Sequence, residues 1–295
     1  MPTHVHVPTR SEITELLSSN GLHPSRALGQ NFVVDPNTVR RVVRLADVVP
    51  GQHVVEIGAG LGSLTIALVE AGAKVTALEV DRGILPVLRG IVEPLGVRVI
   101  DADALAVDWQ ALLGVRGAGD VASPPGASWS LVANLPYNIA VPVVLRALDE
   151  AGDIGSMLVM VQREVGERLA ALPGDDLYGA VSVKVAYHAH ATVVGRVPAT
   201  VFLPRPKVES VLVRIDRRPA VAVDPDVVSH DRLLALVHAG FAQRRKMLRR
   251  SLAGLVTPEV FDAARVAPTS RAEELGVEDW GRLAAGLERR VERPR

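Results

Sequence analysis

Short apolar runs alternate with helical stretches through the middle of the chain. The runs read as strands and are HVVEIG (53–58), KVTALEV (74–80), VRVID (97–101), SLVANL (130–135) and SMLVMVQ (156–162). Apolar residues recur at helical spacing between them, near residues 63–71, 82–93, 107–114 and 141–150. Strands that alternate with helices are joined by right-handed crossovers and form a parallel sheet covered on both faces. The pattern therefore predicts a Rossmann-like α/β fold.

Two helices are predicted before this region. The first begins at Thr9, which has the spacing of a capping box with Glu12, and it ends at Asn20-Gly21. The second begins at Asp35, an N-cap residue that a proline follows. The stretch RALGQNFVVD (26–35) between them is too polar for a regular element, so we expect an irregular segment there.

Two late apolar runs and a helical tail complete the pattern. ATVVGRVPA (191–199) and VLVRID (211–216) read as strands that add an antiparallel edge to a mostly parallel sheet. RIDRRPAVAVDPD (214–226) has the composition of a domain boundary, and the pattern after it is purely helical. We predict two domains, residues 1–218 with the sheet and residues 219–295 as a small all-α domain.

Composition excludes several classes of protein. The chain has 295 residues, of which 48% are hydrophobic, and it contains no cysteine. It therefore has no disulfide framework, no thiol nucleophile and no zinc bound by cysteine. No apolar run has the length of a signal-peptide core or a membrane span, and we expect a cytoplasmic protein. The stretch GVRGAGDVASPPGAS (114–128) is expected to be a loop-like insertion without identifiable chemistry.

Charge is segregated along the chain although the formal net charge is zero. The segment FAQRRKMLRRSL (241–252) contains no acidic residue, and its cations are Arg244, Arg245, Lys246, Arg249 and Arg250. A local basic patch is enough to bind the phosphates of a nucleic acid.

A glycine-rich loop follows the first strand of the sheet. In VVEIGAGLGSLT (54–65) the glycines are Gly58, Gly60 and Gly62, and they allow a tight turn and a close approach to a ligand at a helix N-terminus. A dinucleotide loop requires its third glycine where this chain has Ser63. Spacing at every second residue, after the acidic Glu56, favours a ligand without a pyrophosphate.

Carboxylates follow the next two strands. Glu79, in LEVD (78–81), ends the second strand, where it can accept hydrogen bonds from both hydroxyls of a ribose. Asp103, in DADAL (101–105), follows the third strand and is placed to accept from an exocyclic adenine amine. A ribose and an adenine without phosphate describe S-adenosylmethionine.

The fourth strand delivers the tetrapeptide Asn134, Leu135, Pro136 and Tyr137 to the same edge of the sheet. An adenine N6 amine is a poor nucleophile because its lone pair is delocalised into the ring. The Asn134 side-chain oxygen and the Leu135 carbonyl can accept its two protons and favour a reactive geometry. Pro136 rigidifies the turn, and Tyr137 can stack on the base.

These motifs together resemble the bacterial small-subunit (16S) ribosomal RNA adenine-N6,N6-dimethyltransferases, over nearly the whole chain. The motifs in order are LGQNFVVD (28–35), VVEIGAGLGSLT, LEVD, DADAL and NLPYN, then VQREVGERLAALPGDDLYGAVSV (161–183), VFLPRPKVESVL (201–212) and the basic segment. Two positions depart from the family, because Met247 stands where relatives commonly have threonine and Arg250 where many have asparagine.

The resemblance implies a class I methyltransferase fold and several roles for individual residues. It places Gln30, Asn31 and Val33 at the methionine side of S-adenosylmethionine and Phe202 opposite Tyr137 across a flipped base. It also implies that the basic segment is a helix that contacts RNA through Arg244, Arg245, Lys246 and Arg249. The implied substrate is a pair of adjacent adenosines near the 3′ end of 16S RNA, methylated by a monomeric enzyme during small-subunit biogenesis.

Three other functions compete with this interpretation. The first is a large-subunit RNA adenine-N6 methyltransferase of the macrolide-resistance type, which the LYGAVSV stretch (177–183) disfavours. The second is a nonenzymatic RNA-binding assembly or transcription factor, which would have no need of Asn134 or Glu79. A nicotinamide dehydrogenase is disfavoured by Ser63.

Two histidine pairs are potential metal ligands, at HVH (4–6) and HAH (188–190). Neither pair has a third ligand nearby in the sequence, so we assign no metal.

Overall fold

The computed structural model describes residues 6–25, 27–114 and 129–291, and it divides into two compact units. The first unit contains residues 1–166 and 192–216, and the second contains residues 167–191 and 217–295. The boundary near residue 216 lies close to the expected one at 218. The segment 167–191 was expected in the first domain, but it packs with the helical second unit. The proposed insertion at 114–128 lies outside the described residues after Gly114.

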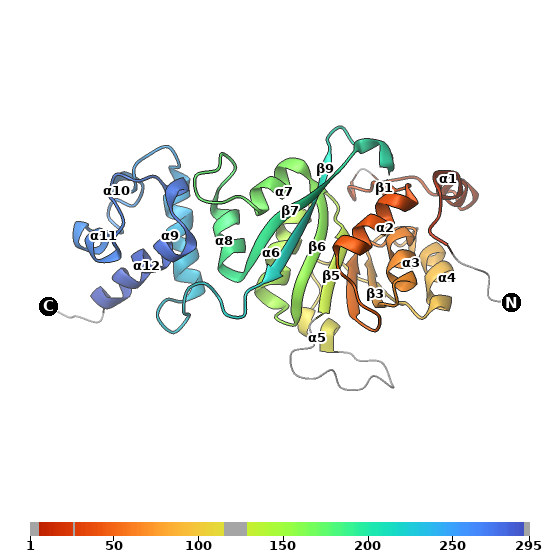
Figure 1. Cartoon of the computed structure of the whole chain (residues 1–295), viewed down its shortest axis with the longest axis horizontal. Helices are drawn as coiled ribbons and strands as arrows, with labels where there is room; N and C mark the ends of the chain where they lie inside the picture. Colours follow the sequence, from red (N-terminus) through yellow and green to blue (C-terminus); the bar gives the residue numbers. More distant parts are fainter. Residues whose placement is uncertain (1–5, 26, 115–128, 292–295) are drawn as a thin grey trace. The chain divides into compact units, whose positions relative to one another are not determined.

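The first unit is built on a seven-stranded sheet with the order β4-β3-β2-β5-β6-β9-β7 (Figure 1). Its strands are β2 (His53–Ile57), β3 (Lys74–Glu79), β4 (Arg98–Asp101), β5 (Trp129–Asn134), β6 (Ile154–Gln162), β7 (Ala189–Val197) and β9 (Ser210–Arg217). Neighbouring strands from β4 to β6 are parallel, and β9 is antiparallel to β6, with Gln162 opposite Ser210. The predicted mostly parallel sheet with an antiparallel edge is confirmed.

Helices cover both faces of this sheet, as the alternating pattern predicts (Figure 1). They are α1 (Arg10–Ser19), α2 (Pro36–Leu45), α3 (Ser63–Glu70), α4 (Leu85–Val92), η1 (Glu93–Leu95), α5 (Trp109–Gly114), α6 (Ala140–Glu150) and α7 (Arg163–Leu169), which crosses into the second unit. Side chains of α1 to α4 share a core with every second residue of the strands, such as Val132 and Leu158. Helix α6 packs on β6 and α5 from the other face.

The predicted starts of the two N-terminal helices are confirmed. The Thr9 backbone N–H donates to the Glu12 carboxylate at 2.7 Å, as a capping box requires. The Asp35 carboxylate accepts from the Thr38 N–H at 2.9 Å, and Pro36 occupies the first turn of α2.

One strand lies where the sequence predicts an irregular segment. Residues Phe32–Val33 form β1, which pairs antiparallel with β8 (Phe202–Leu203) after the short helix η2 (Ala199–Val201). The prediction is wrong at these two residues because a two-residue strand has no local pattern. Its partner lies far along the chain, so only the tertiary fold defines it.

The described part of the second unit is mainly helical, and it also contains the first residues of β7 and the last residue of β9. Its helices are α8 (Ala180–His188), α9 (His230–Ala242), α10 (Leu248–Ser251), α11 (Pro258–Ala264), η3 (Ala272–Glu274) and α12 (Val277–Val291). Trp280, Phe261 and Tyr178 are among the large side chains of its core. None of the helices among the described residues is long and apolar enough to cross a membrane.

The basic segment is not one helix, contrary to the expectation. Helix α9 ends at Ala242, and residues 243–246 form a turn and a bend before α10. Met247 instead forms a β-bridge with Arg271, and the Leu248 N–H donates to the Ser270 carbonyl at 2.7 Å. These tertiary contacts take the place of helical hydrogen bonds across a run of like charges.

Candidate active site

A cavity opens at the carboxyl ends of the parallel strands in the first unit, where ligands of open α/β sheets bind. It is lined by residues 28–33, 56–61, 63–64, 78–80, 102–104, 134–137 and 139. The structure thereby brings together these predicted cofactor residues: Gln30, Asn31, Val33, Glu56, Gly58, Gly60, Glu79, Asp103 and Asn134. Gly62 is not part of the lining. It starts α3 with a φ of 82° and packs against Val92 of α4.

The glycine loop adopts a backbone that requires glycine. Gly58 and Gly60 have φ values of 71° and 57°, in the left-handed region that L side chains rarely adopt. A Cβ atom on Gly60 would lie 3.0 Å from the Phe32 ring, which also lines the cavity. The glycine loop therefore lies so close to Phe32 of β1 that a side chain at position 60 would crowd the Phe32 ring.

Glu79 is a buried carboxylate at the end of β3, with 5% of its surface exposed. It accepts from the Gly60 N–H at 2.8 Å and from the Val80 and Asp81 N–H groups, both at 2.9 Å. Burial raises the pKa of Glu79, although these backbone donors oppose the shift. The carboxylate is held rigidly at the cavity wall, where it can accept from the hydroxyls of a ribose.

Glu56 is a second buried carboxylate in the lining. Its burial raises the pKa to about 8, against a hydrogen bond that the Thr65 hydroxyl donates to it at 2.6 Å. The charge of Glu79 raises this pKa further. The sequence motifs assign no role to Thr65. Its hydroxyl is a polar group in the otherwise apolar run LTIALV of α3, and this exception could have indicated a buried hydrogen bond.

Asp103 and Gln30 are two further polar residues of the lining. The Asp103 carboxylate accepts from the Leu105 N–H at 2.8 Å, and the side chain is exposed at the cavity edge. The Gln30 amide donates to Asp81 at 2.7 Å and accepts from the Ser25 N–H at 2.7 Å. Gln30 thus ties the N-terminal segment to the end of β3.

The NLPY turn meets the N-terminal segment at the floor of the cavity. The Asn134 side-chain N–H donates to the Asn31 carbonyl oxygen at 2.9 Å. The Leu135 N–H donates to the Met160 carbonyl at 3.1 Å, and this bond holds the turn on β6. Pro136 packs close to Gly58 and Gly29. The turn is therefore fixed on three sides.

The two aromatic residues of the predicted base-binding site differ in exposure. Tyr137 lines the cavity, and its hydroxyl lies 2.8 Å from the Ser210 hydroxyl at the start of β9. Burial raises the pKa of Tyr137, so it stays a neutral phenol. Phe202 is buried in the core with 1% exposure and is not among the lining residues. Its strand partner Val33 does line the cavity.

The lining fits S-adenosylmethionine. It supplies a carboxylate for a ribose, an exposed carboxylate for an adenine amine and apolar walls from Leu61, Leu64 and Ile57. Glycines without Cβ atoms leave room for a close approach of the ligand. No cluster of cations that would bind a pyrophosphate occurs among these lining residues.

The predicted RNA-contacting cations lie in the second unit and differ in their partners. Arg244 forms an ion pair with Glu273, with 2.6 Å between Nε and the carboxylate, and it also donates to the Asp176 carbonyl. Arg245, Lys246 and Arg249 are exposed, and no ion pair of theirs is found in the part of the chain that the structure describes. Arg244 therefore joins two segments of the unit, and its three neighbours present their charge to solvent.

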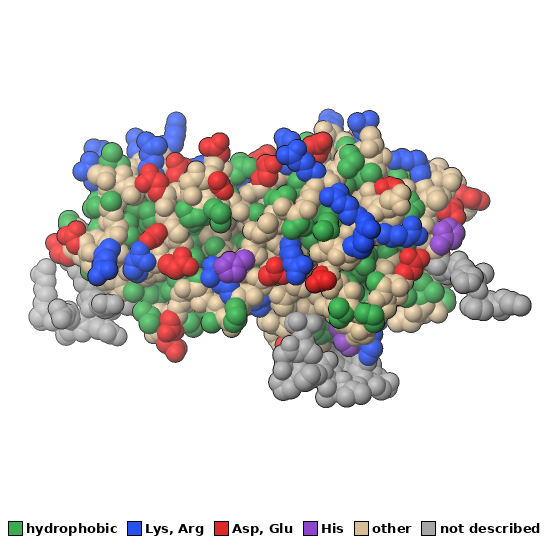
Figure 2. All heavy atoms as spheres, in the orientation of Figure 1, with side chains coloured by type: hydrophobic (Ala, Val, Ile, Leu, Met, Phe, Trp, Pro, Cys, Tyr) green, Lys and Arg blue, Asp and Glu red, His purple; other side chains and the backbone are tan. Residues whose placement is uncertain are grey.

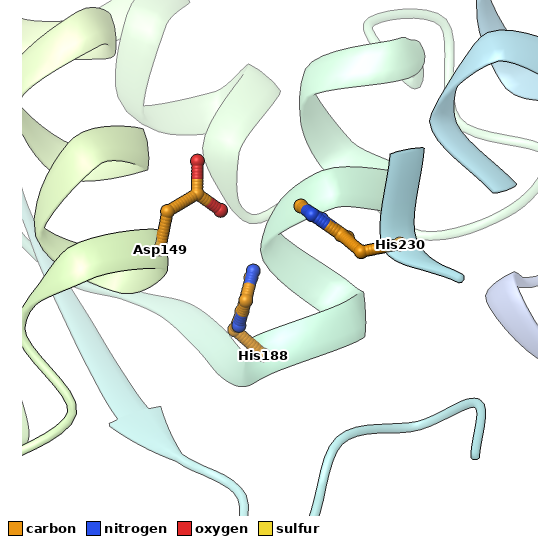
Figure 3. A group of neighbouring side chains, drawn as sticks. All are labelled: Asp149, His188 and His230. Atoms are coloured by element: carbon orange, nitrogen blue, oxygen red, sulfur yellow. The ribbon is translucent and has the colours of Figure 1, made fainter. Parts of the chain in front are cut away.

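Histidines gather elsewhere in the second unit. His188 of α8 has His230 of α9 as its neighbour, with 5.2 Å between ring centroids (Figure 3), and Tyr187 also stacks near His230. Asp149, drawn in the same figure, belongs to the first unit. Two rings are fewer ligands than the three or four of a protein zinc site, and we assign no metal to the pair.

Known proteins similar to this chain were found by sequence. The family model "Ribosomal RNA adenine dimethylase" matches residues 23–288. Proteins named "Ribosomal RNA small subunit methyltransferase A" from Kineococcus radiotolerans and Thermobifida fusca are 45% and 43% identical in sequence to this chain. The alignments cover 93% of this chain and 89% of the first relative, and 94% of both chains for the second.

Solved structures of similar fold agree. A 23S rRNA methyltransferase, ErmE, superposes with a TM-score of 0.66 at 23% identity, over 87% of this chain and 99% of that one. A dimethyladenosine transferase from Plasmodium falciparum gives 0.68 at 21% identity, over 84% and 94%. These two likenesses show the class I methyltransferase fold, and the sequence matches show the family. The chain belongs to the ribosomal RNA adenine dimethylase family and is an S-adenosylmethionine-dependent enzyme that methylates adenine in ribosomal RNA.

Proposed function

We propose that this enzyme dimethylates N6 of two adjacent adenosines near the 3′ end of 16S RNA during small-subunit assembly. The orientation of the Asn134 amide is the observation that carries the chemistry. Because the N–H side of the amide is bound to the Asn31 carbonyl, the Oδ1 side is left to accept from a substrate amine. The names of the relatives, which specify the small subunit, support the choice of RNA.

The residues of the turn act on the amine of the target base. Asn134 Oδ1 and the Leu135 carbonyl accept its two protons and stabilise the positive charge that develops on nitrogen. S-adenosylmethionine supplies an electrophilic methyl group on a sulfonium. Since two oriented acceptors favour the reactive amine, no strong general base is required. Pro136 keeps the turn rigid and offers no competing N–H.

The cofactor residues divide by position in the cavity. Glu79 accepts from the ribose and Asp103 from the adenine amine. Glu56, Gly58 and Gly60 line the cavity beside Glu79, and Gly62 starts the helix behind the loop. Gln30, Asn31 and Val33 bound the methionine side, next to the acceptor pair.

The target base must leave its stack to reach this cavity, so an RNA with unpaired or weakly paired adenosines is expected. Tyr137 is held by Ser210 in a position to stack on that base, a contact worth about 1–3 kcal/mol. Phe202 would have to leave the core to reach the base, so we assign stacking to Tyr137 and packing beneath β1 to Phe202.

The RNA outside the cavity is bound by Arg245, Lys246 and Arg249, whose exposed charges suit phosphates. We expect the enzyme to act as a monomer in the cytoplasm, where small subunits assemble. The alternative, a large-subunit substrate, which ErmE has by its name, is disfavoured because the relatives by sequence are named for the small subunit.

Methylation of defined RNA substrates decides between the two. Purified enzyme and labelled S-adenosylmethionine are incubated with small-subunit assembly intermediates or with large-subunit RNA, and the modified positions are mapped. Label in two adjacent adenosines near the 3′ end of 16S RNA is expected. Label in large-subunit RNA alone would overturn the assignment. Ribosomes from a strain without this protein should lack the same modification.

A further inference from the structure

Helix α2 sorts its residues into an apolar and a cationic face. Val39, Val42 and Val43 are buried in the core where α2 packs on α3 and β1, which directs Arg40 and Arg44, one turn apart, to the solvent side. Arg41 lies at the edge of this face and is half-buried. The helix carries no acidic residue.

Arg41 joins this face to the end of β7. Its Nη1 donates to the Arg196 carbonyl at 2.9 Å, across 155 residues of sequence. The guanidinium lies against Gly195, in the space that a Cβ atom would otherwise fill. Arg196 itself is exposed. Arg40, Arg41, Arg44 and Arg196 thus form one surface, which we call the α2–β7 arginine surface.

The charge of this surface is largely uncompensated. Arg40 lies 3.8 Å from Glu70, a pair in which both side chains are well exposed. Arg44 and Arg196 form no ion pair within the described ranges of the chain. Figure 2 shows Lys and Arg side chains gathered over α2 on the face in view. A surplus of cations in a chain of zero net charge suits a polyanion.

The surface adjoins the cavity through both of its elements. Helix α2 follows directly on the cavity-lining Asn31 to Val33, and the Val34 N–H donates to the Val201 carbonyl at 2.8 Å. β7 leads through η2 to β8, which pairs with β1. At 1.5 Å per residue, Arg40 and Arg44 lie about 6 and about 12 Å along the helix from its cavity end. RNA that leaves the cavity can cross this surface within a few nucleotides.

We propose that the α2–β7 arginine surface binds backbone phosphates of the RNA that flanks the target adenosines. This inference rests on the proposed function and adds a second RNA surface, within the first unit, to the basic segment. Phosphates bound there fix the path of the RNA strand across the enzyme. That path determines which base enters the cavity. The partner is RNA rather than an acidic protein because the same unit takes an RNA base.

Charge reversal at the two unpaired arginines tests the surface. Arg44→Glu and Arg196→Glu are compared with Arg98→Glu, an equal change of charge on the exposed edge strand β4. Binding of a 16S 3′-end RNA is measured against salt concentration, together with KM for RNA and the Kd of S-adenosylmethionine. We expect about tenfold weaker RNA binding, a salt slope lower by roughly one per lost contact and an unchanged cofactor Kd. Arg98→Glu should match the wild type.

Two further measurements keep the test decisive. Arg44→Gln, which keeps a helix-forming side chain, should show a smaller loss in the same direction, and thermal unfolding checks that each variant is folded. RNA affinities equal to that of Arg98→Glu would overturn the surface. So would unchanged binding of free RNA with weakened binding to assembling subunits, which would indicate a protein partner. If the wild type binds RNA but does not methylate it, the proposed function fails separately.

Discussion

The Asn134 side-chain N–H donates to the Asn31 backbone carbonyl at 2.9 Å, across 103 residues of sequence. An amide rotated by 180° would set its oxygen against that carbonyl, so the contact selects one orientation. The N-terminal segment therefore both lines the cavity and orients the Asn134 amide, which the proposed function places against the substrate amine.

Replacing this amide should abolish methylation. Asn134→Ala removes an acceptor aimed at developing charge, so we expect turnover to fall by about 10²–10³-fold while the Kd of S-adenosylmethionine changes less than about tenfold. Single-turnover methylation and calorimetry measure the two quantities. The control is Asn138→Ala, in the same turn. The Asn138 side-chain N–H makes a long hydrogen bond of 3.5 Å to the Ala27 carbonyl, so its loss should matter less. Near-normal turnover in Asn134→Ala would contradict the acceptor role.

A methyl group on the glycine loop should damage cofactor binding. Gly60→Ala places a Cβ atom 3.0 Å from the Phe32 ring and strains a backbone with φ of 57°, at a cost of about 1–2 kcal/mol. We expect the affinity for S-adenosylmethionine to fall at least about tenfold.

Gly96→Ala is the matched control for that variant. Gly96 has a φ of 84°, and a Cβ atom there meets nothing within 4 Å. Both variants strain a left-handed backbone, and Gly60→Ala should lose more stability in thermal unfolding because of its contact with Phe32. Calorimetry should show a loss of affinity in Gly60→Ala alone. Equal affinities in the two variants would show that the loop does not closely approach the cofactor.

Glu56 should make stability depend on pH in an unusual direction. Its folded-state pKa of about 8 lies above the unfolded value of 4.5, so between these values the folded protein holds a proton that the unfolded chain has released. The free energy of unfolding should therefore fall as pH rises through this window, by up to about 1.4 kcal/mol per unit. Below about pH 4.5 the contribution of Glu56 is constant.

Glu56→Gln isolates this contribution because glutamine stays neutral and still accepts from Thr65. Denaturant unfolding of the cofactor-free protein at about pH 5, 6, 7 and 8 should show a shallower decline in the variant. Parallel curves would mean that Glu56 is ionised in the folded protein at neutral pH.

The cations of the basic segment should separate into two kinds. Arg245→Gln and Lys246→Gln should each reduce the salt slope of RNA binding by roughly 0.7–0.9, because each removes one phosphate contact. Arg244→Gln should mainly destabilise the second unit, by about 1 kcal/mol or less, since it breaks a partly exposed ion pair with Glu273. Filter binding over a salt series and thermal unfolding give the two readouts. A full slope change in Arg244→Gln would make it an RNA contact.

Much of the fold follows from local pattern. The strands of the parallel sheet are short, mainly apolar runs, and the helix starts at Thr9 and Asp35 carry cap residues. The carboxylates Glu79 and Asp103 were predicted at the cavity because parallel strands end at one edge of a sheet.

The remaining features depend on partners that are distant in sequence. β1 exists only because Phe202 and Leu203 pair with it, and the basic segment turns because Met247 pairs with Arg271. The burial of Phe202 and the contact of Arg244 with Glu273 likewise depend on residues that no local window includes. The sequence predicts best the roles of residues that lie at strand ends. Prediction from sequence fails where the contacts of a side chain depend on residues far along the chain.

The pairing of β1 with β8 has a consequence for synthesis of the enzyme. Residues 28–33 form one wall of the cavity, yet the strand that holds them ends at Leu203. During synthesis, Leu203 must leave the ribosome before β8 can pair with β1 and this wall can form. Closing so long a loop is a slow step. The enzyme therefore completes this wall of its cavity only after most of the chain has been synthesised.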